Sequence, residues 1–496
     1  MAEATPTETP LLFERSTPGQ RASDLPPLDV PEASLPDGLV EAHAPTLPEV
    51  GPLELVRHYT MLARRSFSVD GNFYPLGSCT MKFNPRINEA AAAMPGFAAL
   101  HPLQDDATIQ GALAILYELR CDLAEIAGLD EVSLQPAAGA HGEYTALRVM
   151  RAWFADPDGG NQPQRTVVLA PDTAHGTNPA SCTMCGAQVV SVPSSNGLVD
   201  LDALRAAVDD RTMAMMITNP NTAGLFDGAI GTIAEILHEA GALLYLDGAN
   251  MNAIVGVARP GDFGVDAMHF NTHKTFSTPH GCGGPGAGPV AVRDFLAPYL
   301  PVPQIVATPA ADGGTTYRLD DQRPASIGKV RSFFGQFGVL LRCWTYLRAC
   351  GPDGLEHVAR TAVLNANYLA ARLRHRFEMP YFDPDQRRYC AHEFVTVPES
   401  VLARGVTLID IAKRLIDFGI HPPTMHWPVH NCLMIEPTET ESLATLDRFI
   451  QVLIQIADEV EKDASHVKTA PHDAPVTRVD EVAAARAPVL TASDNA

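Results

Sequence analysis

Two charged residues, each at or just after an apolar run, could together support covalent chemistry. Asp247 ends the run Ala242–Leu246, and Lys274 comes shortly after the run Ala267–Asn271. A lysine amine can form a Schiff base with an aldehyde, and a carboxylate can keep a pyridine nitrogen protonated so that the ring accepts electrons. A pyridoxal-phosphate (PLP) enzyme needs such a pair. Aspartate and lysine are also common at strand ends without a cofactor, so the spacing leaves both interpretations open.

The scarcity of lysine favours a functional role for Lys274. The chain has six lysines and thirty arginines. A lysine at a strand end is therefore less easily explained as one of many surface charges.

Two further segments could complete a site for a flat, phosphorylated cofactor. Residues 135–143 read QPAAGAHGE and lead into the helical pattern Tyr144–Trp153, which would present backbone N–H groups to a phosphate. His175, in AHGTNPAS, follows a strand that ends near Ala170, and its imidazole could stack on a ring and exchange protons. Each segment has a simpler alternative, an ordinary glycine-containing turn and a solvated loop histidine.

One glycine-rich segment matches a motif of dinucleotide-binding sites. Residues 281–286 read GCGGPG and satisfy the dinucleotide-binding pattern G-x-G-x-x-G, which should directly follow a strand and open a helix. Here Pro279 and His280 precede the pattern, and Pro285 and Pro289 would break a helix. We interpret the segment as a loop whose glycines let the backbone pass close to a cofactor.

Two groups of metal-binding residue types lack the context of a metal site. Cys182 and Cys185 form a CxxC pair, but no second pair lies at zinc-ribbon spacing. His421, His426 and His430 lie in a Pro-rich stretch without a helical i, i+4 pair on an acidic motif. We therefore expect no metal.

The composition excludes several classes of protein. With 496 residues, 46% of them hydrophobic, the chain is long enough for two or three domains with their own cores. Its formal net charge of −22 repels nucleic-acid phosphates and anionic lipid, and its apolar runs are shorter than the ~20 residues that span a bilayer. We therefore expect neither nucleic acid nor a membrane as a partner. Nine scattered cysteines and an N-terminus without a signal peptide predict a cytoplasmic location.

Alternating elements must position the candidate residues. Between about residue 105 and residue 300, apolar runs alternate with helical patterns, which predicts an α/β fold with a mostly parallel sheet covered on both faces. Ligands of such sheets gather at the carboxyl ends of the strands. The predicted strands are Thr166–Leu169, Val189–Val192, Ala214–Thr218, Ala242–Asp247 and Ala267–Asn271, with predicted helices such as Leu201–Val208 and Gly231–Ala240 between them.

Changes in composition and in apolar patterning along the sequence predict four regions. Residues 1–60 are rich in Pro and acidic residues and are expected to form an extended arm, before a large PLP-binding domain over 61–330. Residues 331–465 are expected to form a smaller α+β domain, and 466–496 a disordered tail. The smaller domain would contain the helical stretches Phe333–Leu347 and Leu355–Phe377 and the strand-like run Glu393–Val397.

Several long motifs occur together over about residues 11–450. They are LLFERS (11–16), FYPLGSCTMKFNP (73–85), QPAAGAHGE, AHGTNPAS, TNPNTAGLF (218–226), DGANMNAI (247–254), NTHKTFSTPHG (271–281), and HPPTMHWP followed by MIEPTETES (434–442). Motifs of this length and number are highly specific. The chain resembles the PLP-bearing half of the glycine decarboxylase P-proteins, in the form of the separate second subunit of many bacteria.

The resemblance implies a fold, a cofactor and a set of site residues. The fold would be PLP-dependent transferase fold type I, an α/β large domain with a smaller α+β C-terminal domain. Pyridoxal 5′-phosphate would be covalently bound to Lys274, with His175 stacked on its ring and Asp247 paired with its pyridine nitrogen. The other cofactor-binding residues that it implies are Ala138, Gly139, Ala140, Thr222, Asn271 and His273. Cys182 and Cys282 depart from the residues usual in the family, and neither position is catalytic.

The resemblance also implies a reaction and partners. The chain would decarboxylate glycine through a PLP aldimine, release CO₂ and transfer the aminomethyl group to the lipoyl arm of the H-protein. A companion first subunit would complete a heterotetramer of two of each. Two alternatives remain: another fold-type-I PLP enzyme, such as an aminotransferase or stand-alone decarboxylase, and a non-catalytic scaffold half. The strand-end context of Lys274 argues against the scaffold.

Overall fold

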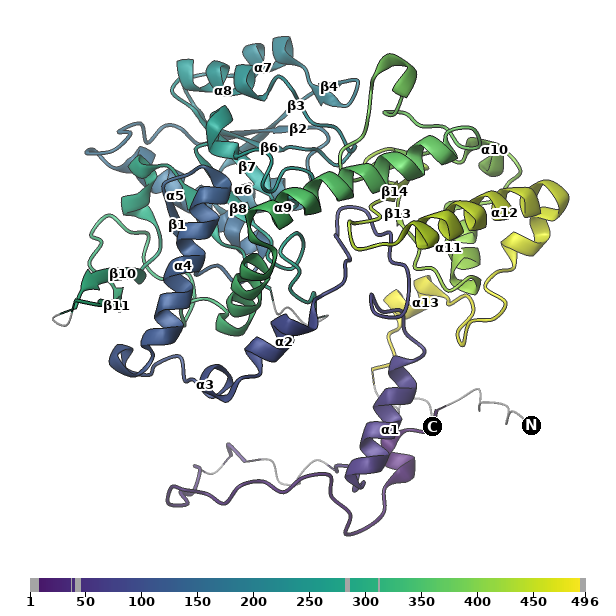
Figure 1. The fold of residues 1–496 in the computed structure, drawn as a ribbon, viewed down its shortest axis with the longest axis horizontal. Coiled ribbons are helices and arrows are strands. Elements are labelled where there is room, and N and C mark those ends of the chain that lie inside the picture. The colour runs from purple at the N-terminus through teal and green to yellow at the C-terminus, as the bar shows by residue number, and fades with distance from the viewer. Residues whose placement is uncertain (1–8, 37, 41–45, 282–285, 311–312, 491–496) are drawn as a thin grey trace. The chain divides into compact units, whose positions relative to one another are not determined.

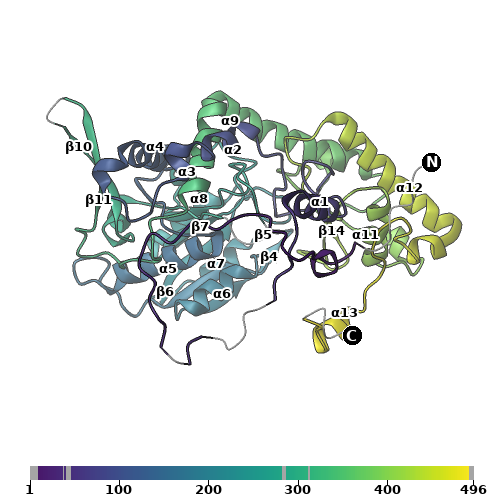
Figure 2. The ribbon, with the colours of Figure 1, turned by 90° about the horizontal axis from the view of Figure 1, so that it is seen from below.

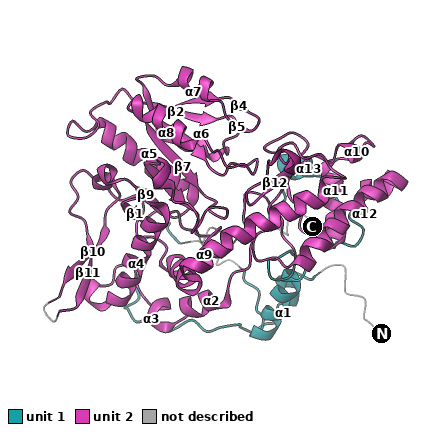
Figure 3. Ribbon diagram, turned by 45° about the horizontal axis from the view of Figure 1, so that its top comes forward, with its two compact units in different colours: residues 1–72, 471–496 teal, residues 73–470 magenta. Residues whose placement is uncertain are grey.

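The computed structural model describes residues 9–36, 38–40, 46–281, 286–310 and 313–490. It divides into two compact units, coloured separately in Figure 3: residues 1–72 with 471–496, and residues 73–470. None of the described helices is long and apolar enough to cross a membrane.

The larger unit contains a seven-stranded sheet, which lies on the left in Figure 1. Its strand order is β1-β9-β8-β7-β6-β2-β3, in which only β9 runs antiparallel to its neighbours. The strands are β1 (Glu131–Ser133), β2 (Val167–Pro171), β3 (Gln188–Val192), β6 (Thr212–Thr218), β7 (Leu243–Gly248), β8 (Ala267–Phe270) and β9 (Val290–Val292). This confirms the predicted mostly parallel sheet. The two strands that were not predicted, β1 and β9, have only three residues each, too few to show a periodic pattern.

Strand β7 shows why the sheet is covered on both faces. Leu244 and Leu246 belong to one core, which contains residues of α4 (Gln110–Ala127) and α8 (Ile230–Glu239), while Leu243 and Tyr245 belong to the other. Successive side chains of a strand point to opposite faces, so a strand buried on both faces is apolar at nearly every position. The other core contains residues of α5 (Gly139–Ala155) and α6 (Thr177–Met184), which lie below the sheet in Figure 2.

A three-stranded antiparallel sheet forms the centre of the C-terminal part of this unit, in the order β12 (Phe394–Thr396), β14 (Leu433–Ile435) and β13 (Thr424–Met425). A separate core surrounds it, with residues of α9 (Phe337–Leu373), α11 (Leu408–Asp417) and α12 (Leu443–Lys468). Helix α9 contains most of both predicted helical stretches and contributes to both sheets' cores (Figure 1). It is kinked at Gly351, whose φ of 63° favours glycine, and Pro352 follows.

The remaining elements are shorter or peripheral. They are α1 (Pro52–Ala63), α2 (Arg86–Ala92), α3 (Pro95–Ala98), α7 (Leu201–Ala207), α10 (Glu399–Leu402), α13 (Glu481–Arg486), β4 (Ser194–Ser195), β5 (Leu198–Val199), β10 (Gln304–Pro309) and β11 (Thr315–Asp320).

The smaller unit contains structure inside both the predicted arm and the predicted tail. In the arm, Ser16 and Thr17 bind Glu49: Thr17 N donates to Glu49 O at 2.7 Å, and Ser16 Oγ accepts from Glu49 N at 2.9 Å. Helix α1 follows this contact. In the tail, the Asp480 side chain caps α13 by accepting from Ala483 N at 2.8 Å. The predicted boundaries at residues 60, 330 and 465 stay predictions.

Candidate active site

A cavity of about 280 Å³ lies where β6, β7 and β8 end. Thr218 and Asp247 are paired in register on β6 and β7, and Asn271 directly follows β8. The cavity is lined by every residue predicted for the site, namely Ala138, Gly139, Ala140, His175, Thr222, Asp247, Asn271, His273 and Lys274. The structure therefore brings together residues that the sequence places more than a hundred positions apart.

Asp247 is a buried carboxylate with several partners. Its Oδ2 accepts from Asn178 Nδ2 at 3.0 Å, its Oδ1 accepts from Ala249 N at 3.0 Å, and His269 Nε2 lies 3.5 Å from Oδ1. Burial alone would raise the pKa of Asp247, but His269, the Asn178 hydrogen bond and the charge of Lys274 together lower it. Asp247 is therefore ionised at neutral pH, as a partner for a protonated pyridine nitrogen must be.

A second layer orients His269 toward Asp247. Nδ1 of His269 lies 2.6 Å from the Tyr245 hydroxyl, and both side chains are fully buried. Burial, together with the charges of Glu143 and Asp247, raises the pKa of Tyr245 well above its usual value. Tyr245 therefore keeps its proton and can donate it to Nδ1 of His269, which holds the ring beside the carboxylate.

The loop that carries Lys274 is held from three sides. The Lys274 backbone N–H donates to Asn271 O at 3.1 Å, which closes a turn at the end of β8. On the next residue, Thr275 Oγ1 accepts from Met251 N at 2.9 Å, and Thr275 O accepts from Lys82 Nζ at 2.7 Å. These bonds fix the backbone while the Lys274 side chain faces the cavity.

The N-terminus of α5 forms part of the cavity wall. A Cβ on Gly139 would overlap Asn271 Oδ1, so this close approach requires glycine. Asn271 Oδ1 and His273 Nδ1 are buried without a hydrogen-bond partner among the described residues. Burial, with the charges of His280 and Lys274, lowers the pKa of His273 to about 3, so its ring is neutral.

These features fit PLP. A helix N-terminus with unused N–H groups suits a phosphate, and unpartnered buried polar atoms need a ligand. Lys274 and the ionised Asp247 provide the amine and the counter-charge that the aldehyde and the pyridine nitrogen of this cofactor need.

His175 lies beside the cavity on an exposed loop. Its Nδ1 is 2.9 Å from Thr177 Oγ1, which donates to Glu143 Oε1 at 2.9 Å. Its ring meets the edge of Trp427 at a centroid distance of 5.5 Å. The hydroxyl of Thr222 donates to Thr173 O at 3.1 Å, so this residue also has a local partner.

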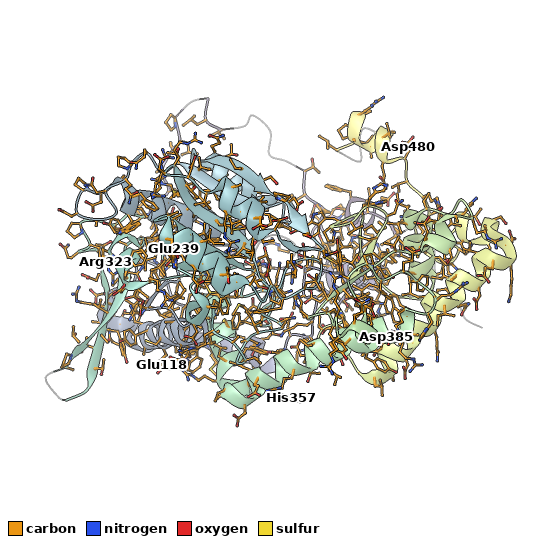
Figure 4. All side chains as sticks on the ribbon, turned by 90° about the horizontal axis from the view of Figure 1, so that it is seen from above. Glu118, Glu239, Arg323, His357, Asp385 and Asp480 are labelled. Atoms are coloured by element: carbon orange, nitrogen blue, oxygen red, sulfur yellow. The ribbon has the colours of Figure 1, made fainter. Side chains whose placement is uncertain are left out.

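Sequence reasoning missed several residues of the cavity, among them Ser78, Glu143, His392 and Glu393. Many charged side chains are exposed, such as Glu118, Glu239 and Asp385, which are labelled in Figure 4. Glu143 and Glu393 are instead buried. No spacing rule links Glu393 to Lys274, because it comes from the C-terminal part of the chain. A carboxylate at the start of the strand-like run Glu393–Val397 was the available signal.

The residues of the other motifs have local roles. Cys182 and Cys185 are buried in the core beside α5, and burial raises their thiol pKa values to about 12 and about 11. His421 stacks on Tyr74 at a centroid distance of 3.7 Å, away from His426 and His430, whose rings lie 5.8 Å apart. Residues 282–285, which include Cys282 and most of the glycine-rich loop, lie outside the described residues.

Comparisons with known proteins agree with this geometry. The family model "Glycine cleavage system P-protein" matches residues 32–404, and "Glycine dehydrogenase, C-terminal domain" matches residues 358–478. Proteins named probable glycine dehydrogenase (decarboxylating) subunit 2 from Halalkalibacterium halodurans and Bacillus licheniformis are each 53% identical over 487 residues. Those matches cover 97% of this chain and 97% and 98% of the relatives.

Solved structures show the same fold. An inhibitor-bound glycine decarboxylase (P-protein) of the glycine cleavage system matches with a TM-score of 0.71 at 22% identity, covering 85% of this chain and 93% of that one. A cysteine desulfurase from Escherichia coli matches with a TM-score of 0.58 at 15% identity, covering 81% and 98%. The predicted PLP fold type I with a C-terminal domain is confirmed. The family models and the two relatives together show that this chain belongs to the glycine cleavage system P-protein family.

Proposed function

We propose that this chain decarboxylates glycine with PLP held covalently by Lys274, and that it transfers the remaining aminomethyl group to the lipoyl arm of the H-protein. The single observation that supports this most is the cavity in which Lys274, Asp247 and the N-terminus of α5 meet. Family membership supplies the reaction, and the cavity supplies the residues.

Different residues of the chain would have different roles in this reaction. Bound PLP supplies a ring that accepts the electron pair left behind when the glycine carboxylate departs as CO₂. Asp247 would keep the pyridine nitrogen protonated, and His175 would cover one face of the ring. Lys274 would hold the aldehyde carbon before glycine takes its place and would then be free to move protons.

The phosphate would be bound at the start of α5. Backbone N–H groups of Ala138, Gly139 and Ala140 would face it, with Asn271 and His273 beside them. Thr222 would approach from the loop after β6. The group would thereby be anchored at one end, so that the reacting carbon keeps a fixed position relative to Lys274.

The partners follow from the family. The relatives are named as a second subunit, so a companion first subunit is expected. We propose a heterotetramer of two copies of this chain and two copies of the companion subunit. The lipoylated H-protein would bind to it transiently and accept the aminomethyl group. A cytoplasmic location stays a prediction.

Exchange of label between bicarbonate and the glycine carboxyl group tests the function. We expect exchange by the purified chain with its companion subunit, strongly increased by lipoylated H-protein. Exchange that does not respond to H-protein would instead indicate a stand-alone decarboxylase or aminotransferase. A chain that binds no PLP and catalyses no exchange would indicate a scaffold subunit.

A further inference from the structure

Two buried carboxylates, Glu393 and Glu436, lie together beside the cavity. Side-chain atoms of Glu393, Glu436 and His392 lie within 4.8 Å of one another, and all three residues are at most 2% exposed. Glu393 lines the cavity with Lys274 and Ser78. None of the roles described above uses this pair.

The two carboxylates differ sharply in their hydrogen bonds. Glu436 accepts four: from Thr80 N at 3.0 Å, Thr80 Oγ1 at 2.6 Å, Asn250 Nδ2 at 3.1 Å and Asn252 Nδ2 at 3.1 Å. From the residues that the structure describes, Glu393 accepts one, from Ser78 N at 2.7 Å. Four donors stabilise a carboxylate anion, whereas one leaves most of its lone pairs unsatisfied.

A buried pair at this separation cannot easily carry two negative charges. Four donors stabilise an anion at Glu436 and one does so at Glu393, so a single proton on this pair resides on Glu393. Burial and then the charge of Glu436 raise the pKa of Glu393 well above its usual value, against smaller opposing effects of the Ser78 N–H and Lys274. The other titratable groups near Glu393, among the described residues, are His392, Cys79 and Cys390.

The transfer step in the proposed function consumes a proton. A C–S bond forms between the methylene carbon of glycine and one lipoyl sulfur, and the S–S bond breaks. The electron pair of that bond passes to the second sulfur, which must take up a proton to become a thiol. We propose that Glu393 donates this proton from its place on the cavity wall and is then reprotonated from solvent. The inference rests on the proposed function, because it needs the lipoyl disulfide as co-reactant.

The backbone around Glu393 supports a fixed position for this group. Ala391 N donates to Gly224 O at 2.7 Å, and a Cβ on Gly224 would overlap Glu393 O. Gly224 belongs to the same loop as Thr222. The contact of this loop with the segment Ala391–Glu393 therefore links Glu393 to the residue proposed to approach the phosphate. A donor fixed in this way loses little entropy when the sulfur arrives.

Glu393→Gln removes the acid and keeps the fold. The amide oxygen can still accept from Ser78 N, and the side chain keeps its size. In infrared difference spectra of the PLP-loaded full chain at neutral pH, wild type minus variant should contain the C=O stretch of a protonated carboxyl. Glu399→Gln, an exposed control, should leave that band in place.

A second experiment measures the rate of transfer from glycine to lipoylated H-protein. The variant should keep the glycine-induced change in the PLP absorption spectrum but load the lipoyl arm about 100-fold more slowly, the usual scale for a lost general acid. Glu436→Gln should shift the loss of transfer to lower pH, because removing its charge makes Glu393 a stronger acid.

The outcomes separate the two proposals. Absence of the carboxyl band, or wild-type transfer by Glu393→Gln, overturns the role of Glu393 alone. A wild-type enzyme that cannot load the lipoyl arm overturns the proposed function and this role together. A carboxyl band that disappears in the variant, together with slow transfer and normal glycine binding, supports both.

Discussion

At the scale of single residues, the site depends on charges that would be unfavourable anywhere else in the chain. Asp247 is buried, yet its hydrogen bonds and the nearby His269 keep it ionised. Glu393 is buried with few donors and keeps its proton. Environment thus favours opposite protonation states for two carboxylates that line the same cavity, which is how one site can hold both an anion and an acid.

Asp247→Asn should retain PLP but lose most of the exchange rate. A neutral partner no longer favours the protonated pyridine, and an ionic contact of this kind is worth about 3 kcal/mol in a dry site, or roughly a hundredfold in rate. Exchange kinetics and PLP content measure the two effects separately. Turnover near that of the wild type would show that Asp247 only caps the end of β7.

The residues that sequence reasoning found and missed differ in one respect. Lys274 and Asp247 lie at the ends of strands that are neighbours in a parallel sheet, so strand prediction alone brings them together. Glu393 reaches the cavity from the segment before β12. Its place depends on how the C-terminal part packs on the loop at Gly224, which local patterns do not encode.

At the scale of elements, close approach between α5 and the loop after β8 shapes the phosphate end. Gly139→Ala should push Asn271 out of place and weaken PLP binding, with a stability cost of about 1–3 kcal/mol from overpacking. Gly231→Ala is a matched control, because nothing lies within 4 Å of its added Cβ in α8, and it should be neutral or slightly stabilising. PLP titration and urea unfolding compare the two. Equal PLP affinity of the two variants would show that Gly139 is not part of the PLP site.

A second element, the segment from Gly77 to Asn84, holds the Lys274 loop through a buried ion pair. Lys82 Nζ lies 2.5 Å from Glu439 Oε1 and donates to Tyr346 Oη at 3.2 Å. Burial alone would lower the pKa of Lys82, but Glu439 and Tyr346 raise it above its usual value. The lysine is therefore charged and anchors Thr275 next to Lys274.

Lys82→Met should lower the free energy of unfolding by about 3–5 kcal/mol, because it leaves Glu439 buried without its partner. Breaking the exposed pair of Arg360 and Glu356 by Arg360→Met should cost under about 1 kcal/mol. Urea unfolding of both variants checks the contrast. Equal effects would mean that the buried pair contributes no more to stability than the exposed pair.

At the scale of the whole molecule, the long parallel strands and helices were predictable, because each contains a long, uninterrupted pattern of apolar residues. The smaller C-terminal sheet was less so, since β12, β13 and β14 have at most three residues each. The division into units differs in kind from the predicted regions: residues 1–72 group with 471–496, a long-range pairing that no local pattern encodes.

The N-terminal arm carries apolar side chains that are open to a partner. Leu11 and Phe13 are 48% and 58% exposed, although LLFERS lies in polar surroundings. Burying two leucines and a phenylalanine is worth roughly 5–8 kcal/mol before ordering costs. Deleting residues 1–20 should therefore weaken association with the companion subunit more than it weakens PLP binding.

Co-purification of the two subunits, with and without the arm, measures this effect. Substituting Leu25, an apolar residue of the same arm that is 90% exposed, by Ser serves as the control. Undiminished association of the truncated chain would refute the interface role and would favour an arm that packs on its own chain or on a second copy.

The attachment point of PLP tests the central claim most directly. Borohydride reduction of the purified chain, followed by peptide mapping, should place a phosphopyridoxyl group on the peptide that contains Lys274. Lys274→Ala should carry none and should have lost exchange activity, while its fold is intact. A phosphopyridoxyl group on Lys82 or any other lysine, or unchanged attachment in the variant, would contradict the assignment.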